Sequence, residues 1–379
     1  MNRNLAAGMR IAATVLAPIL LPLSATSIQA QTVAQKIPLV VGLTILTAVS
    51  APIVGDYETL KTVDALAADG AMRMTITGES PNPVDKTTKS LSIGRSVRGA
   101  DLTGAHTYKY VFSSEGENEY AGTTALGASA SVLNDVRSKG RAEVHIDGEA
   151  PGLGGLISGV MNMMTSSTAD RTLGMGTNAS GTLALAEPKP VAFPVIVNNV
   201  RTVLQAWHLK GHLSKGDQPA DIDWYILDDP ANPLSLRYAM GNDKLEVVRI
   251  AYPVANAANE LERSLAHDRR AVLYGIYFDF NSAVMKPQSE PVLREIVDVM
   301  KREPSWTLKV EGHTDNVGGD VKNQDLSARR AASVREALIQ RGVLAARLTT
   351  GGYGASVPRE TNTTLAGRAR NRRVELTRN

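Results

Sequence analysis

Residues 312–330 read GHTDNVGGDVKNQDLSARR, and this stretch decides the fold of the C-terminal part of the chain. The residues that lead into it, WTLKVEGH at 306–313, alternate between apolar and polar side chains, as a half-buried strand does. Beyond it, Val334 and Leu338 continue a spacing of four that begins at Leu326, which places all three on one ridge of a helix. The stretch therefore predicts a strand, a glycine-bearing loop and a helix.

The same alternation of patterns continues on both sides of this stretch. VLYGIYFDF at 272–280 is a strand-like run, and SEPVLREIVDVMKREP at 289–304 has helical spacing with a proline in its first turn and another just past its end. RLTTGGYG at 347–354 and NRRVELT at 371–377 add two more strand-like runs. The order predicts a βαβαββ α/β sandwich over residues 270–379.

The chain before residue 254 has a different texture. From Asp56 to Pro253, short alternating or apolar runs lie between Gly, Pro, Asn and Asp residues, which predicts a mainly antiparallel β domain over residues 31–253. Residues 254–269 are polar, and we expect a partly helical linker there. Residues 1–30 have a basic start, an uncharged apolar run and a small final residue, as a cleaved secretory signal peptide does. The predicted fold class is α+β, in an exported protein.

Two membrane alternatives stay open for the β-rich part. The uncharged stretch Ile37–Gly55 is long enough to cross a membrane as a helix, but its prolines, its glycines and its alternation favour a buried strand. The β-like runs are also compatible with an outer-membrane barrel or porin. Such a barrel is typically girdled by aromatic residues, which make up 4% of this chain, so a β domain in the periplasm is preferred.

Composition narrows the range of functions. The 379 residues include no cysteine, which excludes disulfides, zinc thiolates and a lipid-bearing cysteine within this sequence. The formal net charge is +3, but residues 329–379 hold eleven Arg and three Glu. Because apolar residues keep a structured spacing in this segment, an arginine-rich folded surface is expected rather than a nucleic-acid tail. No nucleic acid, cofactor or metal is predicted as a partner; His208 and His212, which resemble a zinc pair, fit one face of a strand better.

Arg330 is the unusual residue of the predicted helix, because it lies on the same ridge as Leu326 and Val334. Its guanidinium either reaches water over the edge of the core or loses water and meets an anion. Asp315, at the end of the preceding strand, either caps the turn or binds a cation. The two side chains suit each other, and equally a ligand that carries both an ammonium and a carboxylate; the pattern alone leaves this open.

Five motifs together resemble the OmpA-like C-terminal domain, in the right order and spacing. They are YFDFNSAVM at 277–285, VEGHTDNVGG at 310–319, NQDLSARRAASV at 323–334, GYGASVP at 352–358 and GRARNRRVEL at 367–376. The resemblance implies non-enzymatic, noncovalent binding of peptidoglycan through the diaminopimelate side chain of its stem peptide. It also implies a location in the periplasm or outer membrane of a Gram-negative-type envelope.

The resemblance also implies the residues that bind. Asp315 matches the aspartate that takes the ligand ammonium, and Arg330 matches the arginine that takes the ligand carboxylate. Asn323, expected just before the helix, and Asn281 match positions that hydrogen-bond the same group, with Asp279 and Thr314 beside them. Arg372 and Arg373 match a pair whose role is interpreted as structural.

Alternatives to a periplasmic tether are an outer-membrane porin that carries the same peptidoglycan anchor and, less favoured, a cell-wall hydrolase. The hydrolase lacks an evident paired-carboxylate or metal site in the sequence. A second predicted contact uses residues 152–176, where methionines stand among Gly, Ser and Thr; such a segment adapts to an outer-membrane surface, a lipid or a hydrophobic peptide.

Overall fold

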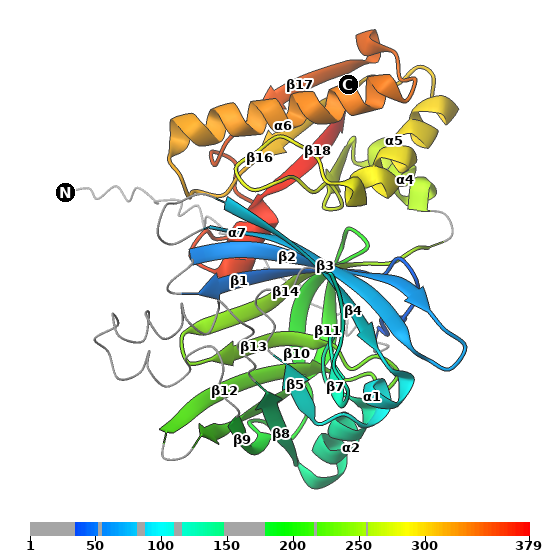
Figure 1. The fold of residues 1–379 in the computed structure, drawn as a ribbon. Coiled ribbons are helices and arrows are strands. Elements are labelled where there is room, and N and C mark those ends of the chain that lie inside the picture. The colour runs from blue at the N-terminus through cyan, green and yellow to red at the C-terminus, as the bar shows by residue number, and fades with distance from the viewer. Residues whose placement is uncertain are drawn as a thin grey trace, which may run out of the picture. The chain divides into compact units, whose positions relative to one another are not determined.

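The computed structural model describes residues 35–51, 55–81, 88–109, 116–147, 179–215, 218–254 and 257–379 (Figure 1). The predicted signal peptide at 1–30 and the methionine-rich segment at 152–176 lie outside these residues. Ala34–Asn379 form one compact unit.

Strands β1 to β14 join in one sheet of the N-terminal part, called here the β region. Their order is β6-β4-β3-β2-β1-β14-β13-β12-β11-β9-β8-β5-β7, and β10 pairs with both β11 and β14. The strands are β1 Thr44–Ala51, β2 Gly55–Leu66, β3 Met72–Pro81, β4 Thr88–Val97, β5 Thr107–Lys109, β6 Gly116–Glu119, β7 Thr123–Thr124, β8 Arg141–Asp147, β9 Ala179–Leu185, β10 Val191–Val197, β11 Val200–Lys215, β12 Gln218–Leu227, β13 Ser235–Met240 and β14 Asp243–Ala251. Neighbours along β1, β2, β3 and β4 and along β11, β12, β13 and β14 pair antiparallel, which confirms the predicted mainly antiparallel β region.

Short helices accompany these strands, α1 Gly99–Gly104 and α2 Ala130–Lys139. Within the uncharged stretch that starts at Ile37, a strand forms only from Thr44, as β1; residues 37–43 are not part of it, and Val41 is 52% exposed rather than buried. His208 and His212 lie within β11, as predicted. Among the described residues, no helix combines the length and the apolar character that a membrane crossing requires.

The C-terminal part has a second sheet, in the order β15-β18-β16-β17, with helices packed against it (Figure 1). Its elements are α4 Ala257–His267, β15 Arg270–Leu273, the 3₁₀ turn η1 Pro287–Ser289, α5 Glu290–Arg302, β16 Leu308–His313, α6 Asp320–Gln340, the 3₁₀ turn η2 Ala345–Arg347, β17 Leu348–Gly352, α7 Leu365–Asn371 and β18 Arg373–Arg378. The predicted α/β sandwich is confirmed, with α7 as an additional helix between its last two strands.

Two local differences from the predicted pattern have clear causes. The strand expected over 272–280 ends at Leu273, because the chain then turns to pack beneath α5, where a Cβ on Gly275 would come within 2.4 Å of Val292. Within the segment predicted as a linker, α4 buries Leu261 and Leu265 in the same apolar core as α5 and β16.

Helix α6 lies unusually close to the sheet, and two glycines make this possible. A Cβ on Gly312 of β16 would lie 2.1 Å from the carbonyl oxygen of Ser327, and one on Gly352 of β17 would lie 2.5 Å from the backbone nitrogen of Ala328. With these side chains absent, Val334 and Leu338 reach full burial. The close approach sets how the end of β16 and the middle of α6 face each other.

We predict that Gly312→Ala lowers the stability of the protein by about 1 to 3 kcal/mol, because the new methyl group forces α6 away from β16. The melting temperature measures this effect. Gly104→Ala is the matched control, since a Cβ at Gly104 meets no atom within 4 Å. Equal melting temperatures for Gly312→Ala and the parent protein would contradict the packing argument.

Candidate functional site

The loop between β16 and α6 presents Asp315. Its Oδ1 accepts a hydrogen bond from the backbone N–H of Val317 at 2.9 Å, so Asp315 caps the turn as one of the two sequence hypotheses stated. Asn323 donates from Nδ2 to the carbonyl oxygens of Asp315 and Val317, both at 3.0 Å, and this braces the loop. Asn323 lies in the first turn of α6 rather than before it, because the helix already begins at Asp320.

Arg330 projects from α6 toward the turn that follows β15. Its Nε donates to the carbonyl oxygen of Ser282 at 2.9 Å, and one terminal nitrogen lies 3.5 Å from the carbonyl oxygen of Asp279. The guanidinium carbon stands 4.9 Å from the centre of the Phe278 ring. Within the part of the chain that the structure describes, no carboxylate lies within ion-pairing distance of Arg330. Its cation is therefore held by carbonyl groups and a ring.

Burial lowers the pKa of Arg330 to about 10, and the negative charges of Glu58 and Asp315 only partly oppose this effect. The side chain stays protonated at neutral pH. Arg330 is half-buried, so its stem is covered while part of the side chain still reaches water at the edge of the site. A partly covered cation that contacts no carboxylate among the described residues is a favourable place for an anionic ligand group, and the planar guanidinium suits a carboxylate.

Arg372 joins two carboxylates at the same place. It donates from one terminal nitrogen to Oδ2 of Asp315, and its other terminal nitrogen lies 2.5 Å from Oε1 of Glu58. Burial lowers the pKa of Arg372, but Glu58 and Asp315 outweigh that effect and raise it above the ordinary value. The Asp315 side chain is 9% exposed and that of Glu58 29%. Asp315 thus pairs with Arg372, and not with Arg330 as the sequence allowed.

The remaining predicted residues lie around this centre. Thr314 is buried, and its hydroxyl has no hydrogen-bond partner among the described atoms. Asp279 pairs with Lys286 at 3.0 Å, while its carbonyl faces Arg330. Asn281 is exposed at the turn, with a left-handed φ of 49°. The structure therefore gathers Asp315, Arg330 and the backbone of Asp279, and leaves the Asn281 side chain at the rim.

Sequence reasoning missed Arg372 and Glu58 as members of this site. The resemblance gives Arg372 only a structural role beside Arg373 in the NRR motif, whereas the structure places it between Asp315 and Glu58. Glu58 lies in β2, where nothing in the local pattern distinguishes it from other strand acids. Phe278, whose ring lies against Arg330, directly precedes Asp279 in the motif at 277–285. Its aromatic side chain is the local sequence feature that points to this contact.

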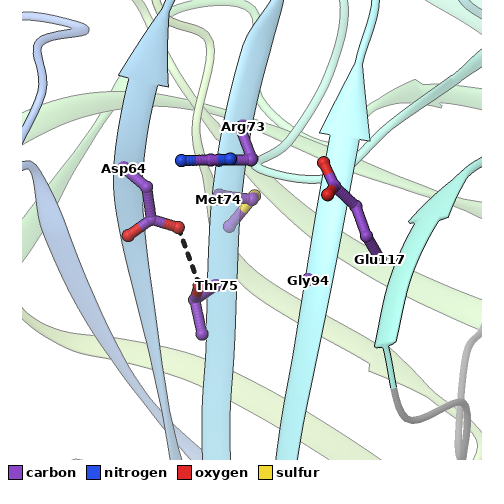
Figure 2. Close-up of a pocket in the computed structure, with 6 residues that line it drawn as sticks. All are labelled: Asp64, Arg73, Met74, Thr75, Gly94 and Glu117. Atoms are coloured by element: carbon purple, nitrogen blue, oxygen red, sulfur yellow. Dashed lines mark hydrogen bonds between the residues drawn. The ribbon is translucent and has the colours of Figure 1, made fainter.

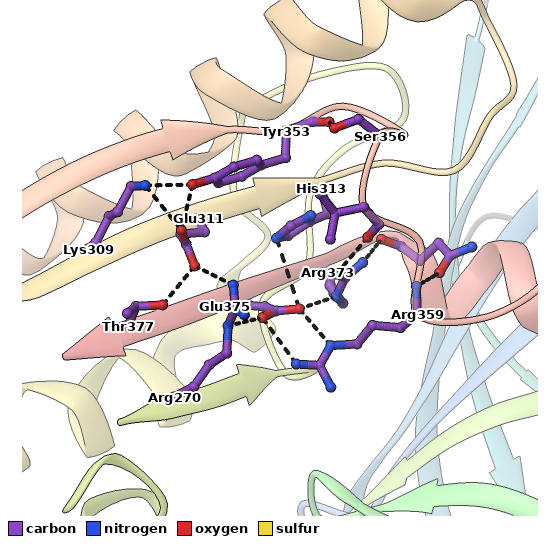
Figure 3. Close-up of polar contacts among 12 residues, drawn as sticks. Arg270, Lys309, Glu311, His313, Tyr353, Ser356, Arg359, Arg373, Glu375 and Thr377 are labelled. Carbon is purple, nitrogen blue, oxygen red and sulfur yellow. Dashed lines mark hydrogen bonds and ion pairs between the residues drawn. The ribbon is translucent and has the colours of Figure 1, made fainter. Parts of the chain in front are cut away.

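A separate charged network lies across β15, β16 and β18 (Figure 3). Glu311 and Glu375 are directly opposite each other in the antiparallel pair β16–β18, an arrangement that needs compensating charges. Arg359 and Arg373 contact Glu375 at 2.7 and 2.5 Å, and Arg270 contacts both acids. Each buried carboxylate is saturated by partners, so this network is structural.

The pKa values in the network follow from these contacts. Burial raises the pKa of both acids, but hydrogen bonds, led by Thr377 for Glu311 and by Arg359 for Glu375, lower each to about 2. Burial and the charge of Arg373 lower the pKa of His313 to about 4, and its ring stacks on Tyr353 with 5.2 Å between centres. His313 is therefore neutral at physiological pH.

A shallow depression on the β region offers a different surface. Asp64, Arg73 and Glu117 surround it on β2, β3 and β6, and Thr75 donates to Asp64 at 2.7 Å (Figure 2). It contains none of the predicted site residues. Within the described residues, no group of three or more His, Cys, Asp or Glu side chains is arranged to hold a metal ion.

Comparison with known proteins assigns the C-terminal part. The OmpA family model matches residues 277–372. These residues form an OmpA family domain. The OmpA domain contains Asp315, Arg330 and Arg372, whereas Glu58 lies outside it.

Relatives share this domain and little else with the chain. The outer membrane porin F of Pseudomonas fluorescens is 46% identical over 100 residues, which are 26% of this chain and 31% of that protein. The peptidoglycan-binding protein ArfA of Mycobacterium bovis is 38% identical over 101 residues, 27% of this chain and 31% of that protein. The chain thus spans about a third of the length of these curated relatives.

A solved structure of the peptidoglycan-associated lipoprotein from Burkholderia pseudomallei is also similar. The two sequences are 31% identical over a match that covers 27% of this chain and 88% of the lipoprotein chain, with a TM-score of 0.26.

We predict that the protein loses stability in two stages as the pH falls. Between about pH 6.5 and 4 the unfolded chain binds a proton at His313 that the folded chain does not, and between about pH 4.5 and 2 the same holds for Glu311 and Glu375. His313→Phe, which keeps a ring against Tyr353, should flatten the first stage. Denaturation midpoints at a series of pH values measure both stages, and an unchanged slope in His313→Phe would refute the assignment.

Proposed function

We propose that the OmpA domain binds peptidoglycan noncovalently, through the diaminopimelate side chain of the stem peptide, as a non-enzymatic element of the cell envelope. The observation that supports the proposal is the half-buried guanidinium of Arg330, which among the described residues contacts carbonyl groups and a ring rather than a carboxylate. A ligand carboxylate would supply the missing anion in two-point contact.

The acidic half of the site favours a ligand that also carries a cation. The negative charge of Asp315 acts on Arg330, and we infer that a ligand group with both charges spans the two side chains. The distal end of diaminopimelate has an ammonium and a carboxylate on one carbon atom. Lysine in the same position of a stem peptide has the ammonium alone, and would leave Arg330 without an anion.

The relatives support the cell-wall assignment. One matched protein is named as peptidoglycan-binding, and the porin is named as an outer membrane protein. We infer from these names that this chain works in the periplasm or at the outer membrane of a Gram-negative-type envelope, where the OmpA domain attaches the β region to the wall.

We predict that Asp315→Ala and Arg330→Ala each abolish sedimentation of the protein with purified diaminopimelate-type sacculi. A charge-assisted hydrogen bond contributes about 1.5 to 3 kcal/mol, or roughly ten- to a hundredfold in affinity. Arg330→Lys should also weaken binding, because lysine lacks the planar pair of donors. The readout is the fraction of protein that pellets at increasing amounts of sacculi.

Arg329→Ala is the control for this experiment. Arg329 is adjacent to Arg330, but it is exposed and pairs with Asp325 one turn earlier at 2.8 Å, so binding should be unchanged. Full binding by an Asp315→Ala/Arg330→Ala double variant would eliminate the site. Equal competition by sacculi cross-linked through lysine would eliminate the diaminopimelate specificity.

A further inference from the structure

The OmpA domain packs against the β region on the side that carries the candidate site. Leu46, Leu60 and Val248 of the β region form one apolar cluster with Tyr277, Ala366 and Ala369 of the OmpA domain. Arg368 of α7 pairs with Asp56 of β2 at the edge of this cluster. The contact is therefore a packed one, and it holds β2 in a defined position.

Strand β2 brings Glu58 to the site from this position. Glu58 lies between Asp56 and Leu60, both of which contact the OmpA domain, so its backbone is held on both sides. Its carboxylate contacts Arg372, and among the charges that act on Arg330 it has the largest effect. Burial raises the pKa of Glu58, but Arg372, Arg249 and Arg330 outweigh it and keep the group ionised.

Glu79 of β3 makes a second contact with this part of the OmpA domain. One oxygen lies 2.6 Å from Nζ of Lys286, and the other accepts from the backbone N–H of Phe280 at 2.5 Å. Phe280 follows Asp279, whose carbonyl group faces Arg330, and Lys286 pairs with the Asp279 side chain. The β region therefore contacts the surroundings of the site through two carboxylates, Glu58 and Glu79.

The residues that would receive a stem peptide are covered in this arrangement. Thr314, Asp315 and Asn323 are 4%, 7% and 5% exposed. Asp315 has both oxygens engaged, by Arg372 and by the N–H of Val317. A ligand zwitterion has to displace these contacts before it can reach Arg330 and Asp315 together.

We propose that Glu58 is an internal competitor of the peptidoglycan carboxylate, so that the β region restrains binding by the OmpA domain until Glu58 withdraws from Arg372. The inference rests on the proposed function: Glu58 holds Arg372, which in turn holds Asp315, and its negative charge acts on Arg330, where the ligand's carboxylate would bind. When Glu58 moves into water and the ligand's carboxylate binds instead, the net charge around Arg372 and Arg330 stays the same. The apparent affinity of the full chain is then reduced by the small fraction of molecules in which Glu58 has withdrawn.

The test compares Glu58→Gln with the parent chain in sedimentation with diaminopimelate-type sacculi. Removal of the competing charge should tighten binding, by about tenfold for a restraint equal to one charge-assisted contact. Asp56→Asn is the matched control on the same strand: it removes an ion pair to the OmpA domain but leaves Arg330 and Arg372 untouched. Its binding should stay within about twofold of the parent.

Glu58→Asp is a second variant, which keeps the charge of β2 while it draws the carboxylate back by one methylene group. It should tighten binding less than Glu58→Gln does. Unchanged or weaker binding by Glu58→Gln, or equal tightening by Asp56→Asn, would overturn the competitor role.

Arg330→Ala, alone and combined with Glu58→Gln, separates this inference from the proposed function. If Arg330→Ala binds normally in both backgrounds, the ligand site itself is wrong. If Arg330→Ala abolishes binding and Glu58→Gln does not tighten it, only the competitor role is lost. Melting temperatures of all variants establish that each is folded.

Discussion

The half-buried cation of Arg330, which contacts no carboxylate among the described residues, is the feature on which the proposed function of the OmpA domain depends. Helix α6, which carries it, lies close against the sheet because Gly312 and Gly352 lack side chains. The carbonyl groups of Ser282 and Asp279 compensate its charge only in part. A half-buried cation in this state attracts a carboxylate, whether from a ligand or from the same chain.

The C-terminal part contains two arginine-rich clusters, one around Glu375 and one around Arg330. Whether each charge has a contacting partner distinguishes the structural cluster from the candidate binding site. Around Glu375, three guanidinium groups surround one carboxylate, and every strong contact is satisfied internally. Around Arg330 the order is reversed, with a cation that contacts no carboxylate in the part of the chain that the structure describes. Satisfied buried networks make a core rigid, whereas an unsatisfied charge is costly unless a partner arrives. Both clusters consist of arginines and carboxylates. They differ in whether the central charged group is in contact with groups of opposite charge.

The site does not belong to the OmpA domain alone. Glu58 and Glu79 reach it from the β region, and the apolar cluster around Leu60 and Tyr277 keeps them there. Under the proposed function, binding at the wall and the position of the β region are coupled, because Arg372 joins Asp315 to Glu58. Such coupling would let the anchor respond to whatever the β region contacts.

The sequence by itself determined the α+β class, the order of strands and helices in the C-terminal sandwich, and the placement of Asp315 and Arg330 on either side of one loop. These features follow from spacings of two and of about four residues, which local sequence displays directly. It did not reveal α7, because a seven-residue helix shows too few turns for a periodic pattern. Tertiary structure alone decided that Asp315 pairs with Arg372, 57 residues away, and that Arg372 also meets Glu58, 314 residues away. Pairings over such distances depend on how whole sheets pack, and no local periodicity encodes them.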